Sequence, residues 1–348
     1  MVCIIINLTY NLFILKKYTT IISVLFLTFS AFAIDEFHLK NNDNFFTDDG
    51  YVSDNRTPNK NQSSSKYFNL GKSLLAGNTD SLKGTAINAL TAEGIGVSKS
   101  FLEKYFPTVE ISANFGDPSK PTAGILVVAP LSDINDVQNT FFTQLSSFYT
   151  DNRTTINIGF GYRRLEFDNK LLLGANVFYD HEFPYDHQRT SVGLEARTTV
   201  GEVNFNQYWG ISGWKDGRNG LEERALGGTD IEVGIPLPYM NWAKFYARSF
   251  VWNAVDGVND IKGNDVSLQA RMKGFIIEAG HRTYNTLSDE DFIRVSYNLN
   301  ADKSDDDFQW FSETAYKLAS MEKHRFDKVR RENLIVKQRR GALRVITR

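Results

Sequence analysis

The sequence predicts an all-β fold, a twelve-stranded antiparallel transmembrane β-barrel with a short N-terminal periplasmic helical segment. From about residue 108 to residue 298, segments of roughly ten residues alternate apolar and polar side chains and are separated by turn residues. The chain starts with an export leader, and no continuous apolar stretch follows it. Aromatic residues make up 13% of this otherwise polar chain of 348 residues, as is typical of membrane-interface girdles. Such a chain can span a membrane only by closing its strands into a barrel.

Residues 1–33 have the features of a secretory leader, which we expect to be cleaved after Ala33. Lys16 and Lys17 precede an apolar run and the small-x-small site AFA that ends the leader. A second apolar run before the lysines indicates either a long leader or a translation start near Leu15. The alternative is an uncleaved anchor helix, which two charges at its centre disfavour.

Two segments separate the leader from the strands. Residues 34–67 are rich in Asn, Asp, Ser and Lys and cannot bury enough apolar surface to fold alone, so we expect a disordered periplasmic linker. In residues 68–106 apolar residues recur at helical intervals broken by glycines. This spacing predicts a short helical periplasmic region.

Residues 107–300 form the predicted transmembrane barrel, in which the period of the apolar residues is two. Ile156, Ile158 and Phe160, for example, alternate with Asn157 and other polar or small residues. A soluble sandwich also alternates, but here the polar faces repeatedly carry charges and glycines, and the apolar faces often end in aromatics. An even number of strands is what a closed bacterial barrel requires. The predicted strands are 108–115, 122–130, 139–150, 153–165, 171–181, 188–199, 203–212, 228–236, 243–252, 265–273, 275–284 and 291–299.

The turns between these strands fall into two classes. If the first strand rises from the periplasm, short turns such as 168–169 lie at the inner end, and the loops 213–227 and 253–264 lie at the outer end. The connections 131–138 and 236–242 are longer exceptions at the inner end. The segment 122–130 is apolar on both faces and is the least regular of the predicted strands.

Five segments in this region carry a resemblance to a known family. They are LLLGANVFYDHEF (171–183), HQRTSVGLEAR (187–197), NQYWGISGWKDG (206–217), EERALGGTDIEV (222–233) and PLPYMNWAKFYAR (236–248). Together they resemble the β-domain of the intimin and invasin family, the inverse autotransporters, over about residues 70–340. The resemblance implies an outer-membrane barrel inserted by the barrel-assembly machinery and periplasmic chaperones, with a passenger that follows the barrel.

The resemblance also implies that residues 301–348 form a linker through or below the pore. Residues 324–340 are similar to the end of the family's linker, with Glu332 where an asparagine is expected. Residues 321–348 hold ten Lys and Arg against three acids, so the alternative is a solvated periplasmic tail. The linker residues expected in the pore are Arg325, Asp327, Arg331 and Asn333.

The inward faces of the strands carry charges of both signs, so a mixed rather than an acidic lumen is expected. Five inward glycines either make room for the linker or relieve crowding in a curved wall. These glycines are Gly159, Gly161, Gly174, Gly193 and Gly210. The residues predicted to face the pore are Asn157, Arg163, Asn176, Asp180, Glu195, Arg197, Asp230, Glu232, Arg271, Glu278, Arg282 and Arg294.

These patterns predict an anchoring and translocation unit of the bacterial outer membrane, in contact with its lipid. Because the chain stops at Arg348, we expect no extracellular adhesin passenger, and a host receptor is left open. The alternatives are a remnant or part of an adhesin or invasin that mediates host-cell attachment, and a passive outer-membrane channel.

Other functions are disfavoured by composition and by missing motifs. A net charge of −2 gives no case for nucleic-acid binding, and Cys3, the only cysteine, lies in the leader. No serine stands in a nucleophile-elbow context, so no catalytic residue, cofactor or enzymatic activity is expected. One cluster has the residue types of metal ligands, but charged hairpin tips are common and we expect no metal there. It consists of Asp180, His181, Glu182, Asp186 and His187.

Overall fold

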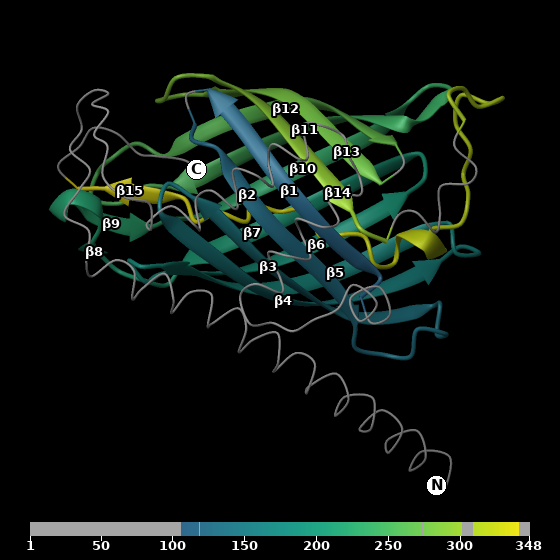
Figure 1. The fold of residues 1–348 in the computed structure, drawn as a ribbon, viewed down its shortest axis with the longest axis horizontal. Helices are drawn as coiled ribbons and strands as arrows, with labels where there is room; N and C mark the ends of the chain where they lie inside the picture. The colour runs from purple at the N-terminus through teal and green to yellow at the C-terminus, as the bar shows by residue number, and fades with distance from the viewer. Residues whose placement is uncertain (1–105, 118, 273, 301–308, 341–348) are drawn as a thin grey trace, which may run out of the picture.

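The protein forms a closed barrel of twelve antiparallel strands in the computed structural model of the chain (Figure 1). The structure describes residues 106–117, 119–272, 274–300 and 309–340. β1 pairs with β14 and closes the ring, so both edges of every barrel strand are hydrogen-bonded, as a lipid environment requires. The barrel strands are β1 Thr108–Asp117, β2 Thr122–Pro130, β3 Asn139–Thr150, β4 Arg153–Glu166, β5 Leu171–Phe183, β6 His187–Thr198, β7 Gly201–Gly210, β10 Gly227–Leu237, β11 Met240–Asn253, β12 Ile261–Met272, β13 Phe275–Tyr284 and β14 Glu290–Asn298.

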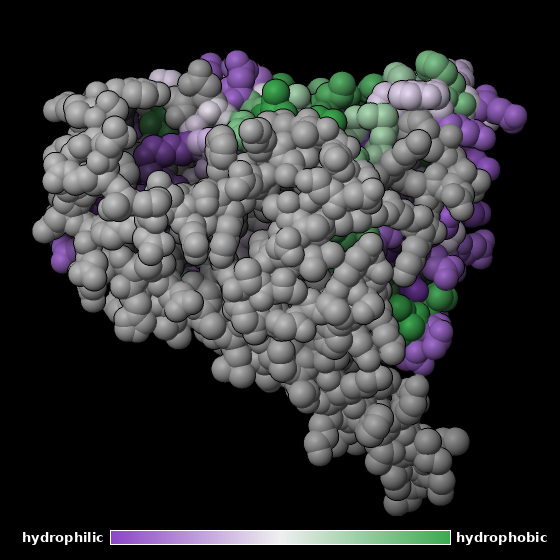
Figure 2. All heavy atoms as spheres, in the orientation of Figure 1, coloured by the Kyte–Doolittle hydropathy of each residue, from purple (hydrophilic) through white to green (hydrophobic). Residues whose placement is uncertain are grey.

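The wall of the barrel separates an apolar outer surface from a polar lumen. In β4 the outward Phe160 is 48% exposed, whereas the inward Asn157 and Arg163 are buried. β5 alternates in the same way, with Val177 outside and Asp180 inside. Along the top edge of the view in Figure 2, the wall is green in the middle and purple toward its ends. An apolar band between polar ends is the surface that a barrel presents to a bilayer.

The twelve predicted strands are all present, with bounds that differ by a few residues. The connection predicted at 236–242 is shorter than expected, because β10 continues to Leu237 and β11 begins at Met240. Residues 1–105, which include the predicted leader, linker and almost all of the helical region, lie outside the described residues, as do 301–308 and 341–348. Among the described residues, no helix has the length and apolar character needed to cross a membrane.

The structure explains why β2 is apolar on both faces. Its inward residues Leu126 and Val128 pack in a buried cluster with Phe142 of β3. The same cluster contains Phe326 and Val329, which come from the C-terminal segment. The inner apolar face of β2 therefore covers an apolar part of a chain that lies inside the barrel.

A small second sheet lies at one end of the barrel. It joins β8 (Lys215–Asp216) and β9 (Glu222–Ala225), from the loop after β7, to β15 (Lys337–Arg339) near the described C-terminal end. A 3-10 turn, Arg218–Gly220, connects β8 to β9, and a second 3-10 turn, Glu322–His324, precedes β15. We call this end, with its long loops, the outer end, and the opposite end, with its short turns, the inner end.

Candidate functional site

The candidate site is the lumen together with the segment 309–340, called the linker below. The linker first follows the inner turns, where Trp242 Nε1 donates to the carbonyl of Trp310 at 2.9 Å. The Met321 amide donates to the Asn169 carbonyl in the turn after β4. The linker then passes through the barrel and ends as β15 at the outer end, as the yellow trace in Figure 1 shows. The chain thus crosses the lumen from the short turns to the long loops.

Arg325 fixes the linker where it enters the barrel. Its guanidinium donates to the carbonyls of Ile134 and Asp136, in the connection between β2 and β3, and to the Thr140 hydroxyl. Next to it, the Thr108 hydroxyl of β1 donates to the Phe326 carbonyl at 2.7 Å. The Phe326 side chain packs into the apolar cluster with β2 and β3. Polar and apolar contacts together close the inner end around the linker.

Deeper in the lumen, basic side chains of the linker meet acids of the wall. Arg331 donates from both Nη atoms to the two carboxylate oxygens of Asp180, at 2.9 and 2.7 Å. Lys328 pairs with Glu110 of β1. Arg330 forms ion pairs with two further acids, Glu232 of β10 and Glu278 of β13. These pairs depend on the side chains of the linker and hold it in one register.

The main chain of the linker is bound as well, by donors of the wall. Within residues 325–334, five wall side chains besides Thr108 donate to seven linker carbonyls. The linker also donates, from the Val329 amide to Gln144 and from the Glu332 amide to the Tyr208 hydroxyl, both at 2.8 Å. The five wall donors are Asn157, Arg163, Arg189, Arg197 and Asn206. Side chains of the wall therefore do for this segment what a neighbouring strand does in a sheet.

At the outer end the linker becomes a strand and is held by buried charges. β15 pairs antiparallel with β9, and the Arg339 guanidinium donates to Glu223 at 2.8 Å. Arg153 at the start of β4 contacts both Glu223 and Glu182, and Lys337 pairs with Glu182. We call these contacts the outer latch. They connect the linker to the loop after β7 and to two barrel strands.

Glu223 is the central acid of the outer latch and lies outside the barrel strands. Burial by itself would raise the pKa of its carboxyl, but His187 at 3.4 Å and the guanidinium of Arg153 outweigh burial. The positive charges of Arg153 and Lys337 act in the same direction. The pKa of Glu223 is consequently held well below its usual value, and this carboxylate stays ionised at neutral pH.

Comparison with known proteins agrees with this geometry. Residues 62–333 match the family model described as "Inverse autotransporter, beta-domain". The chain belongs to the inverse autotransporter β-domain family. It is therefore a barrel of the bacterial outer membrane, in contact with outer-membrane lipid, and its family is one of adhesin and secretion domains.

Curated relatives of this inverse autotransporter β-domain are much longer than the matched segments. Invasin of Yersinia enterocolitica is 29% identical over 182 residues, which cover 51% of this chain and 21% of invasin. A putative attaching and effacing protein homolog of Escherichia coli K12 is 37% identical over 29% of this chain and 34% of its own length. The inverse autotransporter adhesin YeeJ of the same strain is 32% identical over 29% of this chain and 4% of its own length.

A solved structure supports the fold. It comes from work on the in-meso crystallization of membrane proteins and superposes on this β-domain with a TM-score of 0.54. The two chains are 21% identical, and the match covers 67% of this chain and all of the other. At this identity the likeness concerns the fold alone, which is that of a barrel in a membrane.

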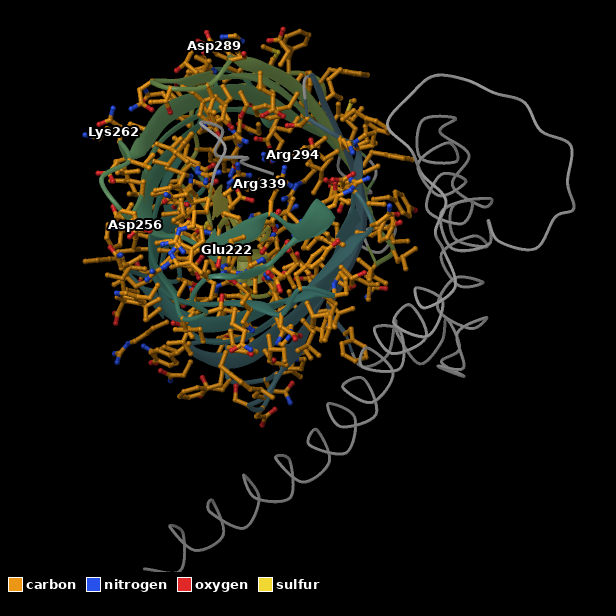
Figure 3. All side chains as sticks on the ribbon, turned by 90° about the vertical axis from the view of Figure 1, so that its left-hand side faces the viewer. Glu222, Asp256, Lys262, Asp289, Arg294 and Arg339 are labelled. Carbon is orange, nitrogen blue, oxygen red and sulfur yellow. The ribbon has the colours of Figure 1, made fainter. Side chains whose placement is uncertain are left out.

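The residues predicted to face the pore do not all lie in equivalent environments in this β-domain. Ten of the twelve are buried or nearly so, and most form ion pairs or hydrogen bonds there. Arg271 is 47% exposed at the inner end, 3.9 Å from Asp327. Arg294 is 36% exposed and lies 3.6 Å from Glu278, and Figure 3 shows it inside the ring of strands, with Asp256 and Lys262 on the rim.

The inward glycines of the β-domain accommodate large side chains of the wall. A Cβ at Gly161 would lie 2.2 Å from the Phe142 ring, and one at Gly159 would lie 2.2 Å from the Phe178 ring. Both rings belong to the cluster that contains Phe326 of the linker. These two glycines therefore relieve crowding in the wall, and the rings that they admit contact the linker.

Several residues that bind the linker are missing from the sequence-based prediction. Arg189 lies on the inward face of β6 and is completely buried between Asp180 and the linker. Gln144 and Tyr208 bind linker amides, and Glu223 is the centre of the outer latch. The alternation of side chains along β6 indicates that Arg189 faces inward. Its pairing with the linker does not follow from this pattern, because the two partners lie more than a hundred residues apart in the sequence.

The cluster with the residue types of metal ligands is divided by the wall. Asp180 and His187 are buried inside, where they contact Arg331 and Glu223. His181 lies on the other face of β5, stacked on Phe183 at 4.3 Å, and pairs with Asp186 at the hairpin tip. Within the described ranges, no three His, Cys, Asp or Glu side chains come together as metal ligands.

A cavity of about 150 Å³ remains beside the linker. It lies between residues 328–334 of the linker and the inward faces of β10–β14, β1 and β2, with Phe148 of β3 at its edge. Its lining includes Glu110, Glu278, Arg294 and Ser296, so the cavity is polar. It is large enough for several water molecules. The linker therefore fills most of the lumen but lies closer to the opposite wall.

Proposed function

We propose that this β-domain anchors in the outer membrane a polypeptide attached after its C-terminal end, and that the polypeptide reaches the cell surface through the lumen. The passage of the linker from the inner turns to the outer latch carries this proposal. The five wall donors and the ion pairs of Arg330 and Arg331 support it, because they bind the linker along the length of the lumen. A solvated periplasmic tail needs none of these contacts.

We further propose that the attached polypeptide is an adhesin. The support is the printed names of the relatives, an invasin, an attaching and effacing protein homolog and an adhesin. The chain matches 21%, 34% and 4% of their lengths, so most of each relative lies outside the matched segment. The receptor of such an adhesin depends on the passenger and not on the barrel.

Export and assembly complete the proposal. The leader of residues 1–33 supports secretion to the periplasm. A barrel whose strands are paired far from each other in sequence, such as β1 with β14, needs help to close, so we propose the barrel-assembly machinery and periplasmic chaperones as partners. No enzymatic role is proposed for the lumen, because its buried acids and bases are paired with one another or with the linker.

An epitope placed after Arg348 tests the proposal. In intact cells, protease added outside should remove this epitope, whereas the same epitope inserted in the inner connection 131–138 should stay protected until the outer membrane is opened. Heat-dependent migration on gels should show that both proteins contain a folded barrel. Complete protection of the C-terminal epitope in intact cells would rule out passage through the lumen.

A further inference from the structure

The five wall donors Asn157, Arg163, Arg189, Arg197 and Asn206 share one arrangement. Each uses one hydrogen bond or ion pair to a carboxylate of the wall and another bond to a linker carbonyl. Arg189, for example, donates from Nε to Asp180 at 2.8 Å, and from its two Nη atoms to the carbonyls of Glu332 and Leu334. Asn206 donates to Asp230 at 2.8 Å and to a carbonyl at 3.0 Å. The carboxylates therefore orient the donors before any chain is bound.

These donors lie together on one side of the wall. Asn157 and Arg163 lie on β4, Arg189 and Arg197 on β6, and Asn206 on β7. The carbonyls that they bind belong to residues 325, 327, 328, 330, 332, 333 and 334. The donors together span the whole part of the linker that crosses the lumen.

Carbonyl groups are present in every residue, so these donors do not depend on the side chains of the bound chain. In an extended chain, carbonyls on the same side recur every two residues, which is the spacing of Glu332 and Leu334 on Arg189. An extended chain that advances by two residues therefore presents equivalent acceptors to Arg189. The ion pairs of Lys328, Arg330 and Arg331 have the opposite property, because only a basic side chain can form them.

We propose that the five wall donors are a main-chain track, which binds the carbonyls of any extended polypeptide that passes through the lumen. The linker comes to rest there because its own basic side chains match the wall acids in one register. This inference rests on the proposed export function and names its substrate class, an extended polypeptide of any sequence. A chain that enters the lumen loses water from its carbonyls, and the track replaces the lost hydrogen bonds.

Export kinetics test the track in the full chain. Two passengers of equal length, one rich in Gly and Ser and one rich in Thr and Glu, are fused after Arg348 with the same terminal epitope. The double variant Asn157→Ala/Asn206→Ala removes two donors without changing a charge. We expect the epitope to appear on the surface about fivefold more slowly, by the same factor for both passengers, since each lost bond has a modest net value.

Asn176→Ala is the matched control. Asn176 is an inward, buried asparagine of β5, and its side-chain oxygen has no hydrogen-bond partner among the described residues. The Asn176→Ala variant should therefore export both passengers at the wild-type rate. If the double variant does not fold, Arg189→Lys serves instead. This variant keeps a positive charge beside Asp180 but cannot donate to the carbonyls of Glu332 and Leu334 as the guanidinium does. It should also slow the export of both passengers.

Three results would overturn the track. A folded donor variant that exports both passengers at the wild-type rate shows that the donors only hold the finished linker. If the donor variant slows the export of only one passenger, binding in the lumen depends on the side chains of the passenger. Failure of the wild type to export either passenger removes the proposed export function itself, and this outcome differs from the other two because it appears without any substitution.

Discussion

Arg331 of the linker and Asp180 of β5 form a two-pronged ion pair inside the barrel, and both side chains are completely buried. Asp180 also accepts from Arg189 and Asn157, so one carboxylate joins the linker to two wall donors. The Arg331 guanidinium in addition lies 4.2 Å from the centre of the Phe178 ring. This relationship fixes the linker near the middle of its path.

Asp180→Asn should destabilise the protein more than Arg331→Met does. Asp180→Asn leaves two buried guanidinium groups without their acid, at a cost of about 3–5 kcal/mol, whereas after Arg331→Met the carboxylate keeps Arg189. Urea unfolding in detergent micelles measures the difference. The exposed pair of Arg340 and Glu222 is the control, and Arg340→Gln should cost less than about 1 kcal/mol. Equal losses for Asp180→Asn and Arg340→Gln would contradict a buried, shared carboxylate.

Gly161→Val should loosen the linker from within the wall. The new side chain requires the space of the Phe142 ring, which packs against the linker, and overpacking of this kind costs about 1–3 kcal/mol. Limited proteolysis of the purified protein should cut the linker more rapidly than in the wild type. Gly201→Ala, where the nearest atom to a Cβ lies at 3.7 Å, should leave the cleavage rate unchanged. Wild-type cleavage rates for Gly161→Val would show that the Phe142 ring does not hold the linker.

Conductance in planar bilayers should be small for the wild type and larger for Arg330→Ala. The Arg330 side chain bridges Glu232 of β10 and Glu278 of β13 and lines the cavity, so its removal enlarges the cavity. Glu232 then loses its cation while Glu278 keeps Arg294 at 3.6 Å, so the lumen gains one negative charge, which favours cations over anions. A large, steady conductance of the wild type would instead support the passive channel.

The outer latch should weaken at acidic pH through Glu223. Because the pKa of Glu223 in the folded protein is below its unfolded value of about 4.3, its stabilising effect is complete above that pH and is lost as pH falls toward the folded pKa. The thermal stability of the wild type should exceed that of Glu223→Gln near neutral pH. The difference should shrink when the pH is lowered below about 4. A difference that does not change with pH would mean that another group controls the latch.

The barrel was predictable from the sequence because its two surfaces face such different surroundings. Lipid on one side and a polar lumen on the other impose a period of two on every strand, as Phe160 and Asn157 illustrate. The bounds of the strands were less certain, since Pro238 marks the turn between Leu237 and Met240 but does not say how far the strands on either side extend. The local sequence pattern therefore predicted which segments form the wall, but not the residues at which each strand begins and ends.

The contacts of the lumen were only partly predictable. Inward residues such as Arg163 follow from alternation, but their linker partners do not, because the pairing of Arg163 with the carbonyl of Asp327 depends on how the whole barrel is staggered. Strand β15 has three residues and pairs with a four-residue strand in a loop, and strands so short show no periodicity. These features appear only when the barrel is closed around the linker.

The pairing of β15 with β9 has a mechanical consequence for whatever is attached beyond it. β15 runs outward along β9, and main-chain bonds from Leu226 to Val336 and from Arg340 to Glu222 extend the pairing at both ends. A force that pulls the exported end away from the cell is directed along this strand, so the hydrogen bonds are loaded in shear and share the tension. They would otherwise open one after another like a zipper. The barrel therefore resists a pull on its cargo at its rim before the buried ion pairs of the lumen bear any load.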